Sequence, residues 1–271
     1  MVKIIFVCVE TVYIGIVYYL SVIVNDVQAY CELFYCVLND ASGNGIIDVN
    51  LKRGGISVYR NILFDLDGTL TDPGIGITAS VSHALVRFGI TPPHKSELYK
   101  FIGPPLGESL MKYFGMTKEE SVLAIEYYRE YFRVKGIFEN EVYSGIPEML
   151  KYLRDSGCRL LVATSKPEVF AVKILEHFGL AEYFDVIAGA DLEGKRGAKA
   201  DVIRDALGRA GIKELSECIM VGDRLHDIEG AEQAGICSVG VLWGYGSRAE
   251  LTAAGAKYIA ENIGDIPMIV L

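Results

Sequence analysis

The sequence predicts an α/β protein, a doubly wound parallel sheet with a helical domain inserted after its first strand. From Ser57 onward, short apolar runs alternate with amphipathic helical segments, which is typical of parallel, doubly wound sheets. Between residues 74 and 143, however, helical patterns follow one another without a strand. That stretch is too long for a simple crossover connection, so we expect a small separate helical domain there.

Residues 1–57 form an N-terminal extension with no recognisable chemistry. Within it, residues 4–24 are almost wholly apolar and reach the roughly 20 residues that a membrane helix needs. The same run is rich in Val, Ile and Tyr, as buried strands are, and it lacks the small-residue cleavage site of a signal peptide. A membrane anchor and an additional β element therefore stay open, although we favour a disordered tail or a mis-called start near Leu51 or Val58. A turn or loop is expected at residues 39–45.

Short apolar runs bounded by turn residues predict the strands of the sheet. A helix from Gly145 to Ser156 precedes the second strand, and Gly157 supplies its C-terminal stop. A second amphipathic helix is expected from Ala200 to Ala210. The expected strands lie near 61–65, 159–163, 185–188, 218–222 and 237–242, and the expected helices of the insertion at about 77–88, 95–101, 106–114 and 117–135, with a rigid turn at Gly103-Pro104-Pro105-Leu106.

Composition limits the function classes. A chain of 271 residues that is 51% hydrophobic and 23% charged suits one large or two modest globular domains. The formal net charge of -9 argues against a nucleic-acid-binding surface, where a basic patch is expected, but it does not exclude small anionic substrates. The six cysteines contain no Cys-x-x-Cys pair, so neither a zinc site nor a disulfide framework is indicated. A reducing, cytoplasmic location is therefore expected.

Polar side chains that suit phosphate chemistry lie at the predicted strand ends and at one helix start. Because parallel strands place their carboxyl ends along one edge of a sheet, these side chains can converge. Carboxylate oxygens suit Mg²⁺, which also binds substrate phosphate, and a Lys with a hydroxyl can hold the remaining phosphate oxygens. The four groups are Asp65 and Asp67 after the first strand, Thr164 and Ser165 after the second, Lys199 at the start of a helix, and Asp223 and Asp227 after the run Cys218-Ile219-Met220-Val221.

Other polar residues near these groups have plainer interpretations. Asp72 is expected to be a turn or helix-cap residue, and His226 a structural or solvent-facing histidine. Lys195 and Arg196 are expected to be loop residues that add positive potential near the site. Lys166 is either a surface charge or a residue that orients its loop, and the sequence does not decide between these two.

Four motifs, in this order, resemble those of the haloacid dehalogenase superfamily of phosphotransferases. The resemblance covers about residues 60–260. It implies a Rossmann-like core formed by residues 58–73 and 144–271, with an α-helical cap at residues 74–143. The motifs are Asp65-Leu66-Asp67-Gly68-Thr69, then Thr164, then Lys199, then Gly222-Asp223 with Asp227.

The resemblance also implies a covalent mechanism. Asp65 would attack phosphorus to give an aspartyl-phosphate, and Asp67 would protonate the leaving oxygen and later take a proton from water. Thr164 and Lys199 would neutralise the oxygens of the transferring phosphoryl group. The implied phosphate-binding residues are Thr164, Ser165, Lys199 and Gly68, and the implied Mg²⁺ ligands are Asp65, Asp67 through its backbone carbonyl, Asp223 and Asp227.

Asp67 distinguishes branches of this superfamily. A halide leaves without a proton, so an acid at this position favours phosphoryl transfer over dehalogenation. The run from Asp67 to Asp72 resembles that of the phosphoglycolate phosphatase-like group, in contrast to the Val after Gly that is more frequent in mutases. The segments 192–199 and 222–227 resemble those of a bacterial subgroup labelled phosphoglycolate phosphatase or 5′-nucleotidase. We therefore expect a Mg²⁺-dependent phosphatase of small phosphomonoesters, with phosphoglycolate or a nucleoside monophosphate as leading substrate and a sugar-phosphate mutase of the β-phosphoglucomutase kind as the alternative.

Two classes of protein other than an enzyme are alternatives on this sequence. A non-catalytic binding protein on the same fold would be expected to lose a carboxylate or the Lys, and none is missing here. A membrane-tethered protein would depend on residues 4–24. The absence of a Walker-type loop argues against a nucleotide-driven motor or kinase. The expected partner is a small phosphorylated metabolite, and a monomer or a homodimer is expected.

Overall fold

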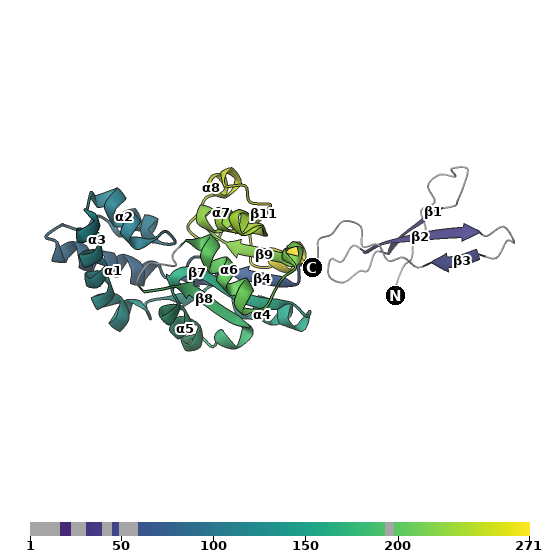
Figure 1. Ribbon diagram of the computed structural model, residues 1–271, viewed down its shortest axis with the longest axis horizontal. Coiled ribbons are helices and arrows are strands. Elements are labelled where there is room, and N and C mark those ends of the chain that lie inside the picture. The colour runs from purple at the N-terminus through teal and green to yellow at the C-terminus, as the bar shows by residue number, and fades with distance from the viewer. Residues whose placement is uncertain (1–16, 23–30, 40–44, 49–58, 193–197) are drawn as a thin grey trace. The chain divides into compact units, whose positions relative to one another are not determined.

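The computed structural model describes residues 17–22, 31–39, 45–48, 59–192 and 198–271. The chain divides into two compact units, Met1–Ser57 and Val58–Leu271, which we treat separately (Figure 1). The described part of the first unit is an antiparallel sheet of order β1-β2-β3. Its strands are β1 (Val17–Val22), β2 (Cys31–Asn39) and β3 (Gly45–Asp48).

Strand β1 lies within the apolar run at residues 4–24, for which a membrane anchor, a β element and a disordered tail were the interpretations. Over Val17–Val22 the chain is a β element, and residues 4–16 lie outside the described residues. Among the described residues, no helix is both long and apolar enough to cross a membrane. The expected loop at residues 39–45 falls mainly on residues 40–44, which are also outside the described part.

The second unit is built on a six-stranded sheet in which neighbouring strands are all parallel. Its order is β11-β10-β9-β4-β7-β8, so β4 lies in the interior although it comes first in this unit. Connections therefore leave β4 toward both sides, which is the doubly wound arrangement that the alternation predicted. The strands are β4 (Asn61–Phe64), β7 (Arg159–Pro167), β8 (Val186–Ala190), β9 (Cys218–Gly222), β10 (Cys237–Val241) and β11 (Tyr258–Ala260).

Helices cover both faces of this sheet. Alternate strand residues face opposite sides, so Ile62 and Phe64 join one hydrophobic cluster while Leu63 joins another. The first cluster includes α4 and α5, and the second includes α6 and α7. Burial on both faces explains why β4 reads as a continuous apolar run. The helices are α4 (Ile146–Asp155), α5 (Glu168–His177), α6 (Lys199–Arg209), α7 (Leu225–Ala234), α8 (Arg248–Ala253) and α9 (Asp265–Val270).

Helices fill most of the segment between β5 and α4, and Figure 1 shows α1, α2 and α3 gathered beyond one edge of the sheet. Helix α3 begins at a capping box, in which Thr117 Oγ1 accepts from Glu120 N at 3.1 Å and Glu120 Oε2 accepts from Thr117 N at 2.8 Å. The elements are α1 (Gly74–Arg87), the 3₁₀ helix η1 (Lys95–Phe101), α2 (Leu106–Phe114), α3 (Lys118–Tyr131) and the π-helical turn η2 (Phe132–Gly136).

Three details differ from the sequence-based expectations. The segment 74–143 was expected to hold no strand, but β6 (Glu141–Val142) lies in it and pairs with β5 (Thr71–Asp72). The second strand of the six-stranded sheet in chain order, β7, continues to Pro167 instead of ending near residue 163. Strand β11 was not expected at all. Two- and three-residue strands are too short to show a period, which is why the sequence does not indicate them.

Candidate active site

Two carboxylates follow the central strand β4 and are buried. Asp65 is 3% exposed and Asp67 is 7% exposed. The turn behind them depends on Gly68, which has a φ of 87°, in the region that favours glycine. A Cβ at Gly68 would lie 2.3 Å from Asp223 Oδ2. Gly68 therefore allows the turn to close against the end of β9.

The Lys199 ammonium lies between two of the predicted site carboxylates. Its Nζ is 2.8 Å from Asp65 Oδ1 and 2.7 Å from Asp227 Oδ1, and it also donates to the carbonyl of Ala163 at 3.2 Å. Burial alone lowers the pKa of Lys199, but the Asp227 and Asp65 charges more than offset this and raise it above its usual value. Lys199 is therefore a fixed cation at the carboxyl ends of the strands.

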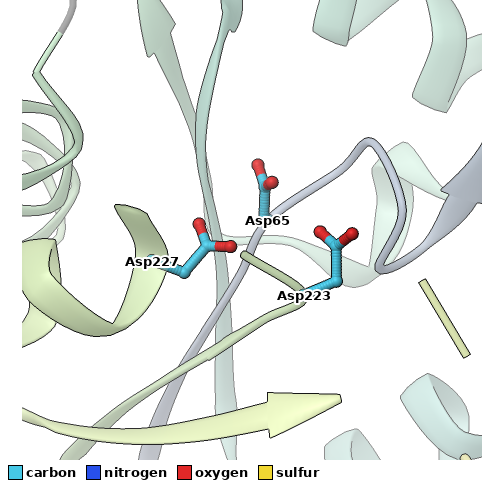
Figure 2. A group of neighbouring side chains, drawn as sticks. All are labelled: Asp65, Asp223 and Asp227. Atoms are coloured by element: carbon cyan, nitrogen blue, oxygen red, sulfur yellow. The ribbon is translucent and has the colours of Figure 1, made fainter. Parts of the chain in front are cut away.

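Asp65, Asp223 and Asp227 are neighbours at the strand ends, as Figure 2 shows. Each offers a carboxylate oxygen, and these oxygens lie within 4.8 Å of one another. Burial raises the pKa of Asp223 well above its usual value, and the charges of Asp227 and Asp65 raise it further. Burial also raises the pKa of Asp227, to about 6, although Lys199 opposes this.

The chemistry of this donor set fits a hard divalent cation. Three buried carboxylates face the single Lys199 ammonium, so negative charge remains uncompensated among the groups named here. Oxygen ligands of this kind suit Mg²⁺ or a similar ion. The Asp67 carboxylate does not belong to this group of three.

Thr164 lies near the end of β7 at the same edge of the sheet and is buried. Its Oγ1 accepts a hydrogen bond from the backbone N–H of Lys166 at 3.3 Å. Ser165 is half-buried beside it. The structure thus places Thr164 at the edge of the sheet where Asp65 and Lys199 meet.

Lys166 is a functional candidate that the sequence left undecided. It is 8% exposed, so the surface-charge interpretation is wrong. Its Nζ lies 2.6 Å from Asp67 Oδ2 and 4.7 Å from the centre of the Phe132 ring in the helical segment. Burial raises the pKa of Asp67, and Lys166 acts against that rise. In the sequence, only its position two residues after Thr164 indicated that Lys166 could belong to the site.

Aromatic residues of the helical segment also reach this site. The rings of Tyr128 and Phe132 stack, with their centres 5.3 Å apart and an angle of 18° between the ring planes. Burial raises the pKa of Tyr128 well above its usual value, and the charge of Asp67 contributes next. The sequence predicted only a helix at about 117–135 here, because a helical period alone does not show which neighbour a side chain meets.

The remaining candidates behave as supporting residues. Asp72 Oδ1 accepts from Gly74 N at 2.9 Å, the bond of a turn just before α1, whose N-cap is Pro73. His226 is half-buried, and burial lowers its pKa, with Arg224 next in importance. Lys195 and Arg196 lie outside the described residues.

Comparison with known proteins gives one family. The sequence model described as haloacid dehalogenase-like hydrolase matches residues 62–241. A 5′-nucleotidase from Pseudomonas aeruginosa is 48% identical over 212 residues, which cover 78% of this chain and 96% of that protein. The tyrosine-protein kinase PtkA from Mycobacterium tuberculosis is 45% identical over 187 residues, covering 68% of this chain and 62% of that one. The crystal structure of a predicted phosphatase from Clostridium acetobutylicum is 49% identical, with a TM-score of 0.77, covering 79% of this chain and 100% of that one.

Proposed function

The chain belongs to the haloacid dehalogenase-like hydrolase family and is a phosphatase of that family, and from this premise we propose that it hydrolyses small phosphomonoesters with Mg²⁺ through an aspartyl-phosphate. One observation carries the proposal. Lys199 Nζ pairs with Asp65 Oδ1 at 2.8 Å and with Asp227 Oδ1 at 2.7 Å, inside a group of three buried carboxylates at the strand ends.

Asp65 is the proposed nucleophile. A carboxylate cannot approach a phosphate dianion unless positive charge offsets the repulsion. Lys199 supplies one such charge, and a Mg²⁺ ion held by Asp65, Asp223, Asp227 and the Asp67 carbonyl would supply Lewis-acid charge neutralisation. Attack by an Asp65 oxygen forms the new bond to phosphorus as the ester oxygen departs.

Thr164 and Lys199 are the proposed phosphate-binding residues, together with Ser165 and Gly68. The Thr164 hydroxyl would donate its hydrogen to a phosphate oxygen while its oxygen accepts from Lys166 N. Lys199 also opposes the negative charge that develops on the equatorial oxygens in the transition state. Both groups come from rigid elements, β7 and α6, which favours a fixed geometry.

Asp67 is the proposed proton carrier. It would give a proton to the leaving oxygen in the first step and take one from the attacking water in the second. Its side chain is not among the three clustered carboxylates that could hold the metal, which supports that role. A dehalogenase would not need this acid, so its presence supports phosphoryl transfer.

Substrate choice is proposed to reside in residues 74–143, acting as a cap over the site. This segment supplies Tyr128 and Phe132 next to the Asp67–Lys166 pair. The relative named 5′-nucleotidase supports a nucleoside monophosphate as substrate, and the wording of the motif around Asp67 supports phosphoglycolate. Both candidate substrates are small monoesters, and in both the phosphoryl group would be transferred to Asp65.

A substrate panel tests the proposal. Phosphate release would be measured from phosphoglycolate, nucleoside monophosphates and sugar phosphates, each with Mg²⁺, with chelator, and with the Asp65→Asn variant. We expect release from at least one monoester, abolished by chelator and by Asp65→Asn. Undiminished release in Asp65→Asn would overturn the covalent mechanism.

Two further arms address other phosphoryl transfers. With β-glucose 1-phosphate, transfer to another hydroxyl in place of phosphate release would support the mutase alternative. The second arm supplies ATP and a tyrosine-containing peptide. If the chain had the activity that the name of the PtkA relative states, the peptide would become phosphorylated. We expect none, and phosphorylated peptide would contradict the proposed hydrolysis.

A further inference from the structure

We propose that Lys166 is a positioning residue that holds one oxygen of Asp67, so that the other oxygen carries the proton to and from the reacting group. The inference rests on the proposed function, in which Asp67 is the proton carrier. It concerns how that acid is held, and it assigns Lys166 a role beyond the four sequence motifs.

The backbone of β7 is irregular where Lys166 stands. Thr164 pairs with Gly189 of β8, whereas the next paired residue is Pro167, which faces Ala190. Ser165 and Lys166 therefore have no partner on β8 and form a bulge. Bulges re-aim side chains and occur next to active sites, and this one directs Lys166 into the interior, where it is buried.

The two Asp67 oxygens are in different surroundings. Oδ2 lies 2.6 Å from Lys166 Nζ. Oδ1 is buried and has no hydrogen-bond partner among the described residues. A buried carboxylate oxygen without a partner is unfavourable, so its retention indicates a use. Lys166 fixes the carboxylate through Oδ2, which leaves Oδ1 as the oxygen that holds the transferable proton.

An aromatic ring of the helical segment also contacts the ammonium. The Phe132 ring centre lies 4.7 Å from Lys166 Nζ, and Phe132 packs edge-on against Phe170 of α5 at 5.4 Å. A cation over an aromatic face is stabilised without a competing hydrogen-bond acceptor. Lys166 therefore stays directed at Asp67, and after Asp67 has given up its proton the same ammonium stabilises the resulting carboxylate.

Lys166 and Lys199 thus serve different carboxylates. Lys199 pairs with Asp65 and Asp227, while Lys166 pairs with Asp67. Removing Lys166 should consequently impair proton transfer while leaving the nucleophile and its cation in place. That separation can be measured with esters whose leaving groups differ in their need for a proton.

The test compares two substrates in one preparation of each variant. One is the best alkyl phosphomonoester of the panel, whose leaving oxygen needs a proton, and the other is p-nitrophenyl phosphate, whose leaving group departs as an anion. For Lys166→Met we expect the single-turnover rate of alcohol release from the alkyl ester to fall about 10- to 100-fold, as for loss of one charge-assisted hydrogen bond. The single-turnover rate of p-nitrophenolate release should fall less than about threefold, because this first step needs no proton from Asp67. The ratio of the two rates does not depend on the folded fraction. Lys166→Arg should restore most of the alkyl-ester rate.

Controls separate this inference from the proposed function. Lys173→Met, at an exposed lysine of α5, should leave both rates unchanged. Asp67→Asn should lower the alkyl-ester rate about 10²- to 10⁴-fold, and adding Lys166→Met to it should lower the rate no further. If Asp67→Asn keeps full activity, the proposed role of Asp67 fails. If Asp67→Asn is impaired but Lys166→Met lowers both substrates equally, or raises only KM, Lys166 is a structural or substrate-binding residue and our inference fails.

Discussion

Arg224 links the fourth motif to the helical segment through the carbonyl of Ile102. Its Nη1 donates to Ile102 O at 2.6 Å, and its Nε pairs with Glu250 Oε1 at 2.9 Å. Gly103 permits this approach, since a Cβ there would lie 2.8 Å from Arg224 Cγ. The residue that follows the candidate metal ligand Asp223 therefore also holds the proposed cap.

Loss of this contact should loosen the cap. We expect Arg224→Ala to lower kcat/KM about tenfold, the effect of one lost hydrogen bond to a charged group, and to speed amide hydrogen exchange around Ile102. Arg133→Ala, at an exposed arginine of η2, is the matched control and should change neither. Unchanged exchange at Ile102 in Arg224→Ala would show that the contact does not hold the cap.

Metal binding should be measurable without turnover. We expect Mg²⁺ at about 100 times its dissociation constant to raise Tm by about 5 to 10 °C, because a ligand that binds only the native state stabilises it. Asp223→Asn should remove this rise, whereas Asp155→Asn, at an exposed carboxylate on α4, should keep it. Calorimetric titration of Mg²⁺ into both variants gives the same comparison directly. A Tm rise retained in Asp223→Asn would exclude Asp223 as a ligand.

The bulge in β7 depends on Gly189. A Cβ at this position would lie 2.6 Å from Lys166 O and 2.6 Å from Glu168 Cα, and backbone atoms cannot move aside readily. We expect Gly189→Ala to destabilise the protein by about 1 to 3 kcal/mol and to lower activity, because Thr164 and Lys166 stand on the displaced segment. Urea unfolding and the substrate panel measure the two effects.

Gly208 provides the contrasting substitution. It lies within α6, and a Cβ there would meet nothing within 4 Å. Gly208→Ala should therefore stabilise the protein by about 0.5 to 1 kcal/mol through higher helix propensity. Equal changes in stability from the two substitutions would show that the bulge is not constrained by Gly189.

Asp185 should give the protein a pH-dependent part of its stability. Burial raises the pKa of this carboxyl, but the hydrogen bonds from Arg159 at 2.8 Å and Arg154 at 2.5 Å outweigh it and hold the pKa below its usual value. A lowered pKa means that the stabilisation is present above the ordinary Asp value, near pH 4, and is lost as the pH falls through the native-state value.

Asp185→Asn tests this sign. Because the pair lies near the surface, we expect the variant to lose about 1 kcal/mol at pH 7. The difference from wild type should shrink as the pH falls below about 4. Urea unfolding at pH 7 and pH 3 measures it, and a difference that grows toward acid would contradict the assignment.

Much of the architecture follows from the sequence by itself. Apolar runs such as Ile62–Phe64 and the helical periods between them determine a parallel sheet, because only a strand buried on both faces is apolar without alternation. The parallel sheet in turn brings strand ends together, so the meeting of Asp65, Lys199 and Asp227 was predictable from their positions. The helix start at Thr117 was close to its expected place because a capping box is a local interaction.

Only the tertiary structure decided which lysine meets which carboxylate. The local sequence does not determine whether Lys166 is solvent-exposed or buried. The bulge that turns it inward arises from the pairing of β7 with β8. Its contacts with Asp67 and Phe132 join three segments distant in the chain. Such contacts depend on how the helical segment packs against the core, which no local pattern encodes, and they distinguish the proposed proton carrier from the proposed nucleophile.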